Sequence, residues 1–141
     1  MFKAVDVKAL KRYVSPNDPD KDNPTVFIIG AIDPVLRSFI DGKCSTIEMD
    51  EKNKTGKRIV IVNATLYSLL TFKYGLRGVE NFFSPDGTTA LALSLGNHSI
   101  GGNSYPCVSD DFISYFHSDL INEVAEEIVK FQSLSGDEIK N

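Results

Sequence analysis

Residues 25–29, Thr-Val-Phe-Ile-Ile, form an unbroken run of β-branched and aromatic side chains that limits what this chain can fold into. Pro24 precedes the run and favours an extended backbone, and Gly30 ends it. Successive side chains of a strand point to opposite faces, so a strand that is apolar throughout has to be covered on both faces. The run therefore predicts an inner strand of a sheet, with other elements packed against it.

Three aspartates, Asp18, Asp20 and Asp22, stand at alternate positions just before this strand, as in the first half of an EF-hand calcium loop. That loop needs a bidentate carboxylate at its twelfth position, where this chain has Ile29. An apolar side chain cannot complete the coordination shell of calcium. We therefore expect a solvated turn that leads into the strand, and no metal site.

Strand signals dominate the first two-thirds of the chain and helix signals the last third. In chain order we expect an ambiguous arm over 1–15, the strand at 25–29, a short helix from Pro34 to Gly42, a hairpin over 45–62, a helix capped by Asn63 or Thr65 with a stripe reaching Arg77, an alternating run with Leu91, Leu93 and Leu95 on one face, a loop over 96–106, and helices that begin near Ser109 and Ser118. The last residues, 133–141, are expected to fray. The order predicts an α+β domain, with a small antiparallel sheet in the N-terminal two-thirds and a helical C-terminal third.

Composition narrows the class of protein. The chain has 141 residues, 42% of them hydrophobic, and a formal net charge of -4, which suits one domain with a sizeable core. Binding to phosphate backbones needs clustered Lys and Arg, and the basic residues here are scattered, so we do not expect nucleic acid as a partner. Residues 1–10 lack the long apolar core of a signal peptide, and no stretch approaches membrane-spanning length, so we expect no membrane association.

No pattern in the sequence supplies a catalytic or cofactor site. His98 and His117 have no recognisable nucleophile near them in sequence, and Cys44 and Cys107 lack the spacing of a zinc site. The residues 75–78, Gly-Leu-Arg-Gly, have the form of the GXXG loop of an RNA-binding KH domain, but the surrounding protein is acidic. We expect a non-enzymatic protein without a cofactor. An RNA-binding or small-molecule-binding module that uses the glycine-rich loops remains an alternative, ranked third after the two given below.

One pattern goes beyond composition and covers residues 18–33, 72–90 and 108–141. The middle segment has the form G-L-x-G-x-x-N-F followed by D-G, carried by Gly75, Leu76, Gly78, Asn81, Phe82, Asp86 and Gly87. In order and spacing, the three segments resemble small proteins encoded among the tail and structural genes of tailed bacteriophages, including tail assembly chaperones. Val79 stands where those proteins more commonly have Trp.

The resemblance implies a protein that acts through protein–protein contacts in tail or virion assembly, in the host cytoplasm and, in one alternative, in the virion. Its partners would be other phage structural or tail proteins, or further copies of itself. A second alternative is a phage-encoded inhibitor or adaptor of a host defence protein, since a small acidic protein can compete for basic surfaces.

The middle segment also supplies the candidate interaction surface: Arg77, Glu80, Asn81, Phe82 and Phe83. Arginine and aromatic side chains are the anchors that the centres of protein interfaces favour. In the alternative interpretation, Phe82 and Phe83 only cap the core.

Overall fold

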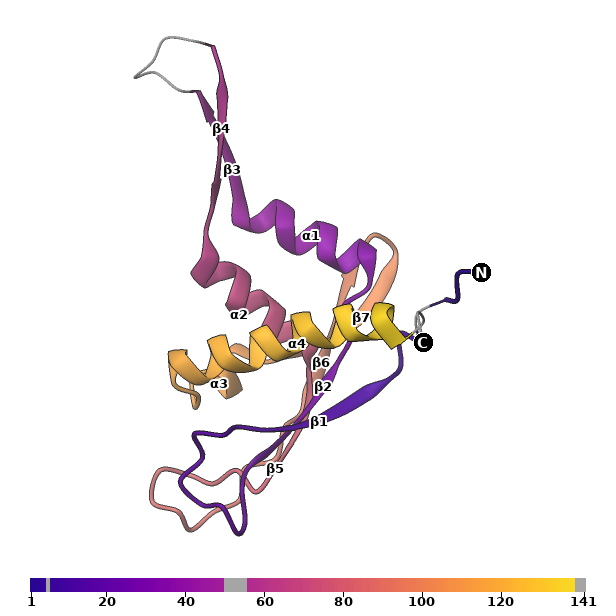
Figure 1. The fold of residues 1–141 in the computed structure, drawn as a ribbon. Coiled ribbons are helices and arrows are strands. Elements are labelled where there is room, and N and C mark those ends of the chain that lie inside the picture. Colours follow the sequence, from indigo (N-terminus) through magenta and orange to yellow (C-terminus); the bar gives the residue numbers. More distant parts are fainter. Residues whose placement is uncertain (5, 50–55, 139–141) are drawn as a thin grey trace.

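This computed structural model describes residues 1–4, 6–49 and 56–138, with side chains through Gln132. Within these residues the fold combines short antiparallel strands with four helices. The elements are β1 (Leu10–Val14), β2 (Val26–Gly30), α1 (Pro34–Cys44), β3 (Ser45–Met49), β4 (Arg58–Val62), α2 (Ala64–Gly75), β5 (Leu76–Glu80), β6 (Leu95–Ile100), β7 (Asn103–Val108), α3 (Asp110–Ile113) and α4 (Ser118–Glu138). Figure 1 shows their arrangement. The α+β class predicted from the sequence is confirmed.

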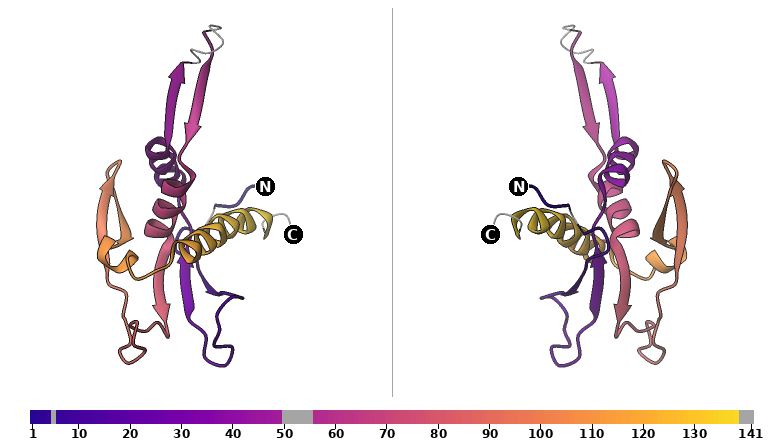
Figure 2. Two further views of the ribbon diagram at one scale, coloured as in Figure 1. Left: turned by 90° about the vertical axis from the view of Figure 1, so that its left-hand side faces the viewer. Right: turned by 90° about the vertical axis from the view of Figure 1, so that its right-hand side faces the viewer.

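The central sheet has the antiparallel order β1-β2-β5, so the apolar run forms its inner strand as predicted. Phe27 and Ile29 are at most 1% exposed and belong to the core, whereas Val26 and Ile28 on the other face are half-buried. Figure 2 shows α4 on one side of α2 and the β6–β7 hairpin on the other. One face of β2 is therefore fully covered and the other only in part.

The helices α2 and α4 pack closely against each other because a glycine stands at their contact. A Cβ placed on Gly75 would lie 2.5 Å from Cδ1 of Ile128, which is less than any real contact allows. The surrounding side chains, Phe72 and Val124, are fully buried. This contact anchors the C-terminal helix on the rest of the domain.

Polar side chains fix the starts of the helices where the sequence predicts them. Asp33 caps α1 by accepting from the backbone N–H of Leu36 at 2.8 Å, with Pro34 as the first helical residue. Asn63 caps α2 in the same way, and Ser109 caps α3. The helix α2 ends at Gly75, so the prediction that its stripe reaches Arg77 was wrong: Arg77 lies in β5.

Two other segments differ from the sequence prediction. Residues 96–106, predicted as loop, are largely the hairpin of β6 and β7, which turns through Gly101 and Gly102, both with positive φ. The N-terminal segment 1–15, whose structure the sequence left ambiguous, contains β1, which pairs with β2 over its whole length. The alternating run before Leu95 is not a named strand; there Phe83 only bridges Ala90.

The hairpin predicted over 45–62 is present as β3 and β4, and its tip, 50–55, lies outside the described residues. It leaves the domain between α1 and α2 and projects away from all other elements (Figure 1). At its base, the backbone N–H of Asn63 donates to the carbonyl oxygen of Cys44 at 2.7 Å. We call β3 and β4 the arm.

Candidate interaction surfaces

The arm exposes aliphatic side chains on both of its faces. The register pairs Ile47 with Val60 and Ser45 with Val62, which puts four apolar side chains on one face. These are Ile47, Met49, Val60 and Val62, which are 63%, 57%, 60% and 59% exposed, and Ile59 and Ile61 on the opposite face are 44% and 46% exposed. None of the six belongs to the core of the domain.

The strands of the arm also have free edges. Among the described residues, β3 pairs only with β4, so the outer edge of each strand keeps unpaired backbone N–H and C=O groups. Natural edge strands are usually protected by proline, bulges or inward-pointing charges, and β4 has none of these between Ile59 and Val62. Contiguous exposed apolar surfaces of this kind occur where proteins bind other proteins, membranes or ligands. The sequence predicted the hairpin but not its exposure.

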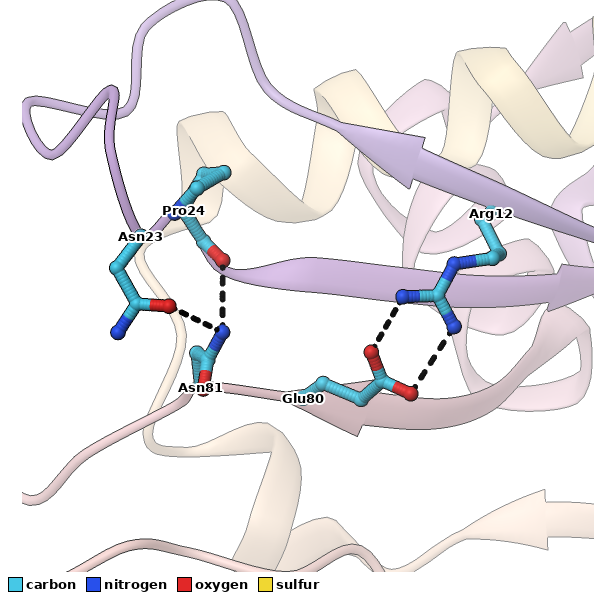
Figure 3. A network of polar contacts seen from close by, with 5 residues as sticks. All are labelled: Arg12, Asn23, Pro24, Glu80 and Asn81. Atoms are coloured by element: carbon cyan, nitrogen blue, oxygen red, sulfur yellow. Dashed lines mark hydrogen bonds and ion pairs between the residues drawn. The ribbon is translucent and has the colours of Figure 1, made fainter.

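The predicted cluster at 77–83 is divided by the structure. Glu80 accepts two hydrogen bonds from the guanidinium of Arg12, at 3.0 and 2.5 Å, across the sheet (Figure 3). Asn81 has a φ of 55°, and its amide nitrogen donates to Asn23 Oδ1 at 2.9 Å and to the carbonyl oxygen of Pro24 at 3.3 Å. Both side chains therefore tie the end of β5 to neighbouring segments of the same chain.

The two phenylalanines of the cluster have different environments. The ring of Phe82 stacks on Phe116 with centroids 4.5 Å apart and is half-buried against the core. Phe83 is 46% exposed. Phe82 therefore packs against the core, as the core-capping interpretation describes, and Phe83 presents more of its ring to solvent.

Arg77 points away from the rest of the cluster. Its guanidinium donates to the carbonyl oxygen of Tyr74 and, at 3.5 Å, to that of Ala31. It lines a groove with Ser104 and Tyr105 of β7. The structure thus brings Glu80, Asn81 and Phe82 to one end of β5 and leaves Arg77 at the other.

A cleft of about 600 Å³ lies beside Phe82, between the 15–25 loop and the start of α4. Its acidic wall includes Glu123, which accepts from the hydroxyl of Tyr13 at 2.8 Å and from the amide nitrogen of Asn17 at 2.9 Å. Burial raises the pKa of Glu123, but hydrogen bonds from Ser15, Tyr13 and Asn17 outweigh it, so the pKa is lowered overall. These contacts hold β1 and the loop that follows it against α4.

The aspartates before β2 stabilise their own loop. The two carboxylate oxygens of Asp18 accept from the backbone N–H groups of Asp20, at 2.9 Å, and of Thr25, at 2.8 Å. Asp20 accepts from the N–H of Asn23 at 3.0 Å. Across the described ranges, no group of three or more His, Cys, Asp or Glu side chains is placed to hold a metal ion.

The two histidines lie in different parts of the fold. Nδ1 of His98 lies 2.6 Å from the hydroxyl of the buried Tyr74, whose pKa burial raises, so the pair joins β6 to α2. His117 lines the cleft beside Phe82.

In the part of the chain that the structure describes, no helix has an apolar stretch of the length needed to cross a bilayer.

Comparisons of the chain with protein-family models, with curated proteins and with solved structures find no match.

Proposed function

We propose that this chain is a non-enzymatic protein that acts through protein–protein contacts, and that these contacts serve tail or virion assembly in a tailed bacteriophage. The observation that carries the proposal is the arm, whose aliphatic side chains are exposed on both faces and whose strand edges are unpaired within the described chain. An isolated two-stranded hairpin has little stability of its own in water. A partner that covers it would supply the missing layer.

The energetics favour a partner protein as the occupant. Fully burying an aliphatic side chain of this size stabilises by about 1.5–3 kcal/mol. More than half of Ile47, Val60 and Val62 is still exposed, so covering them adds about 1 kcal/mol for each. Strand addition at the edge of β4 would satisfy backbone groups at the same time.

The assignment to a phage rests on the resemblance of residues 18–33, 72–90 and 108–141 to small phage tail and structural proteins. Glu80, Asn81 and Phe82 of the middle segment hold the end of β5 to neighbouring parts of the domain. In this proposal the shared segments build the domain that carries the arm.

The test is affinity purification of the tagged chain from cells infected with the phage that encodes it. We expect tail or capsid proteins to co-purify, and their recovery to fall in the double variant Ile47→Thr with Val60→Thr. Thr keeps the β-branched shape, so the hairpin itself should persist. The matched control is Val14→Thr on β1, where Val14 is 43% exposed, and its recovery should equal that of the unchanged chain.

Recovery of a host nuclease instead of phage structural proteins would contradict the assembly role and support the inhibitor or adaptor alternative. Equal recovery with the arm variant and with the unchanged chain would remove the arm from the interface.

A further inference from the structure

Arg77 occupies an irregular position in the central sheet. In the pairing of β2 with β5, Ile28 faces Gly78 and Ile29 faces Leu76, so Arg77 has no partner residue on β2. An extra residue of this kind is a β-bulge, which bends the strand locally and re-aims a side chain. Here the side chain crosses Gly30, where an added Cβ would come within 3.0 Å of the Arg77 Nε. The glycine therefore leaves room for the arginine.

The charge of Arg77 is not compensated within the described chain. No carboxylate oxygen of the described residues lies within 4.0 Å of its guanidinium, in contrast to Arg12, which is paired with Glu80. Burial lowers the pKa of Arg77, as expected for a charge held away from water. Its two hydrogen bonds go to the carbonyl oxygens of Tyr74 and Ala31, and a guanidinium has five N–H donors. Three donors are therefore left for another acceptor.

The groove around Arg77 has a volume of about 490 Å³ and gathers further donors. Lys8 lines it from the segment before β1, and Ser104 lines it from β7. The one carboxylate in its lining, Asp33, already accepts hydrogen bonds from the backbone N–H of Leu36 and, at 2.8 Å, from the hydroxyl of Tyr105. Lys8, Arg77 and Asp33 together give the lining a net charge of +1.

We propose that this groove binds a carboxylate of an extended acidic peptide, with the guanidinium of Arg77 as a bidentate donor. A carboxylate carries one charge, which matches the net charge of the lining, and its two oxygens match the fork of the guanidinium. A phosphate dianion would meet the carboxylate of Asp33 with excess negative charge. The apolar side chains of Val7, Leu10 and Pro106 flank the donors and suit the neighbouring side chains of a peptide.

This site is separate from the arm and does not rest on the proposed assembly function. A ligand here needs only one acidic residue in an extended segment, whichever protein supplies it.

The test is an NMR titration of the full chain, labelled with ¹⁵N, with the peptide acetyl-Gly-Val-Glu-Val-Gly-amide. We expect saturable shifts of the Arg77 Nε–H and Ser104 amide signals. The same peptide with Gln in place of Glu, and inorganic phosphate, should bind much more weakly. Loss of a bidentate charge-assisted pair in Arg77→Gln should weaken binding by about tenfold or more.

Two further variants separate binding from folding. Lys8→Gln changes an exposed side chain of the groove and should weaken binding without altering the rest of the spectrum. Arg12→Gln removes an arginine outside the groove and should bind as the unchanged chain does. Equal binding of the Gln peptide, tighter binding of phosphate, the absence of saturable shifts, or unchanged affinity in Lys8→Gln and Arg77→Gln would each overturn the proposal.

Discussion

The two β-hairpins that stand apart from the central sheet differ in how far the rest of the domain covers them. The β6–β7 hairpin turns through Gly101 and Gly102 and lays Tyr105 and Val108 into the core, at 7% and 0% exposure. The arm, β3–β4, carries more aliphatic side chains than β6–β7, yet leaves Val60 60% exposed. Burial here does not follow hydrophobicity, because the position of each hairpin in the fold decides what can cover it.

This difference shows which parts of the sequence the fold of one chain explains. The apolar residues of β7 are accounted for by contacts with α2 and β5 inside the domain. The apolar residues of the arm make no such contacts in the described chain. Packing within the domain therefore does not explain why residues 59–62 are all aliphatic. In the function proposed above, an external partner supplies that reason.

The largest expected contrast comes from the same substitution in each hairpin. Val108→Ala removes two buried methyl groups and leaves a cavity, so we expect the free energy of unfolding to fall by about 2–3 kcal/mol. Val60→Ala in the arm should change it by no more than about 0.5 kcal/mol. Urea denaturation of both variants measures this. An equally large loss with Val60→Ala would mean that the arm is packed in solution and not free.

Two helical glycines extend the contrast to the helices. Gly75→Ala should destabilise by about 1–2 kcal/mol, because its Cβ collides with the terminal methyl groups of Ile128 in the α2–α4 contact. Gly42→Ala, on the turn of α1 that leads to the arm, meets nothing within 4 Å and should stabilise by about 0.5–1 kcal/mol. Thermal unfolding distinguishes the two signs. Stabilisation by Gly75→Ala would contradict the close approach of α2 and α4.

Lowering the pH should reduce stability by a smaller amount, and only where α4 packs against β1 and the loop that follows it. The lowered pKa of Glu123 means that its contribution to stability is present above the ordinary carboxyl pKa of about 4.3 and is lost as the pH falls through the lower value in the folded state. We expect protection of the β1 amides from hydrogen exchange to fall over this range. Glu123→Gln should flatten the pH dependence of stability, and an unchanged profile would show that the hydrogen bonds from Tyr13 and Asn17 do not form.

Local chemistry explains which elements the sequence predicted. Asp33 before Pro34, and the side chains of Asn63 and Ser109, specify helix starts through hydrogen bonds within three residues. The inner strand followed from its continuous apolarity. Each of these signals lies within a short segment, so it does not depend on contacts with the rest of the fold.

One error concerned a local turn signal, and the others concerned features that depend on contacts between distant segments. Residues 96–106 have the glycine content of a loop, but Gly101-Gly102 is also a two-residue hairpin turn, and this signal was available in the sequence. No local signal marks the bulge at Arg77, since it arises from the pairing of β2 with β5. The predicted cluster is divided because Arg77 lies near the start of β5, whereas Glu80, Asn81 and Phe82 lie at its other end. The exposure of the arm likewise depends on the absence of any covering element in the described chain.

Hydrogen exchange of the arm, free and in a complex purified from infected cells, tests the central claim most directly. In the free protein, the amides of β3 and β4 should exchange much faster than those of β6 and β7, because only one ladder and no core protects them. In the complex, we expect the amides of β3 and β4 to become protected while those of β7 change little. Arm amides that exchange as fast in the complex as in the free protein would contradict the claim that the arm is the interaction surface.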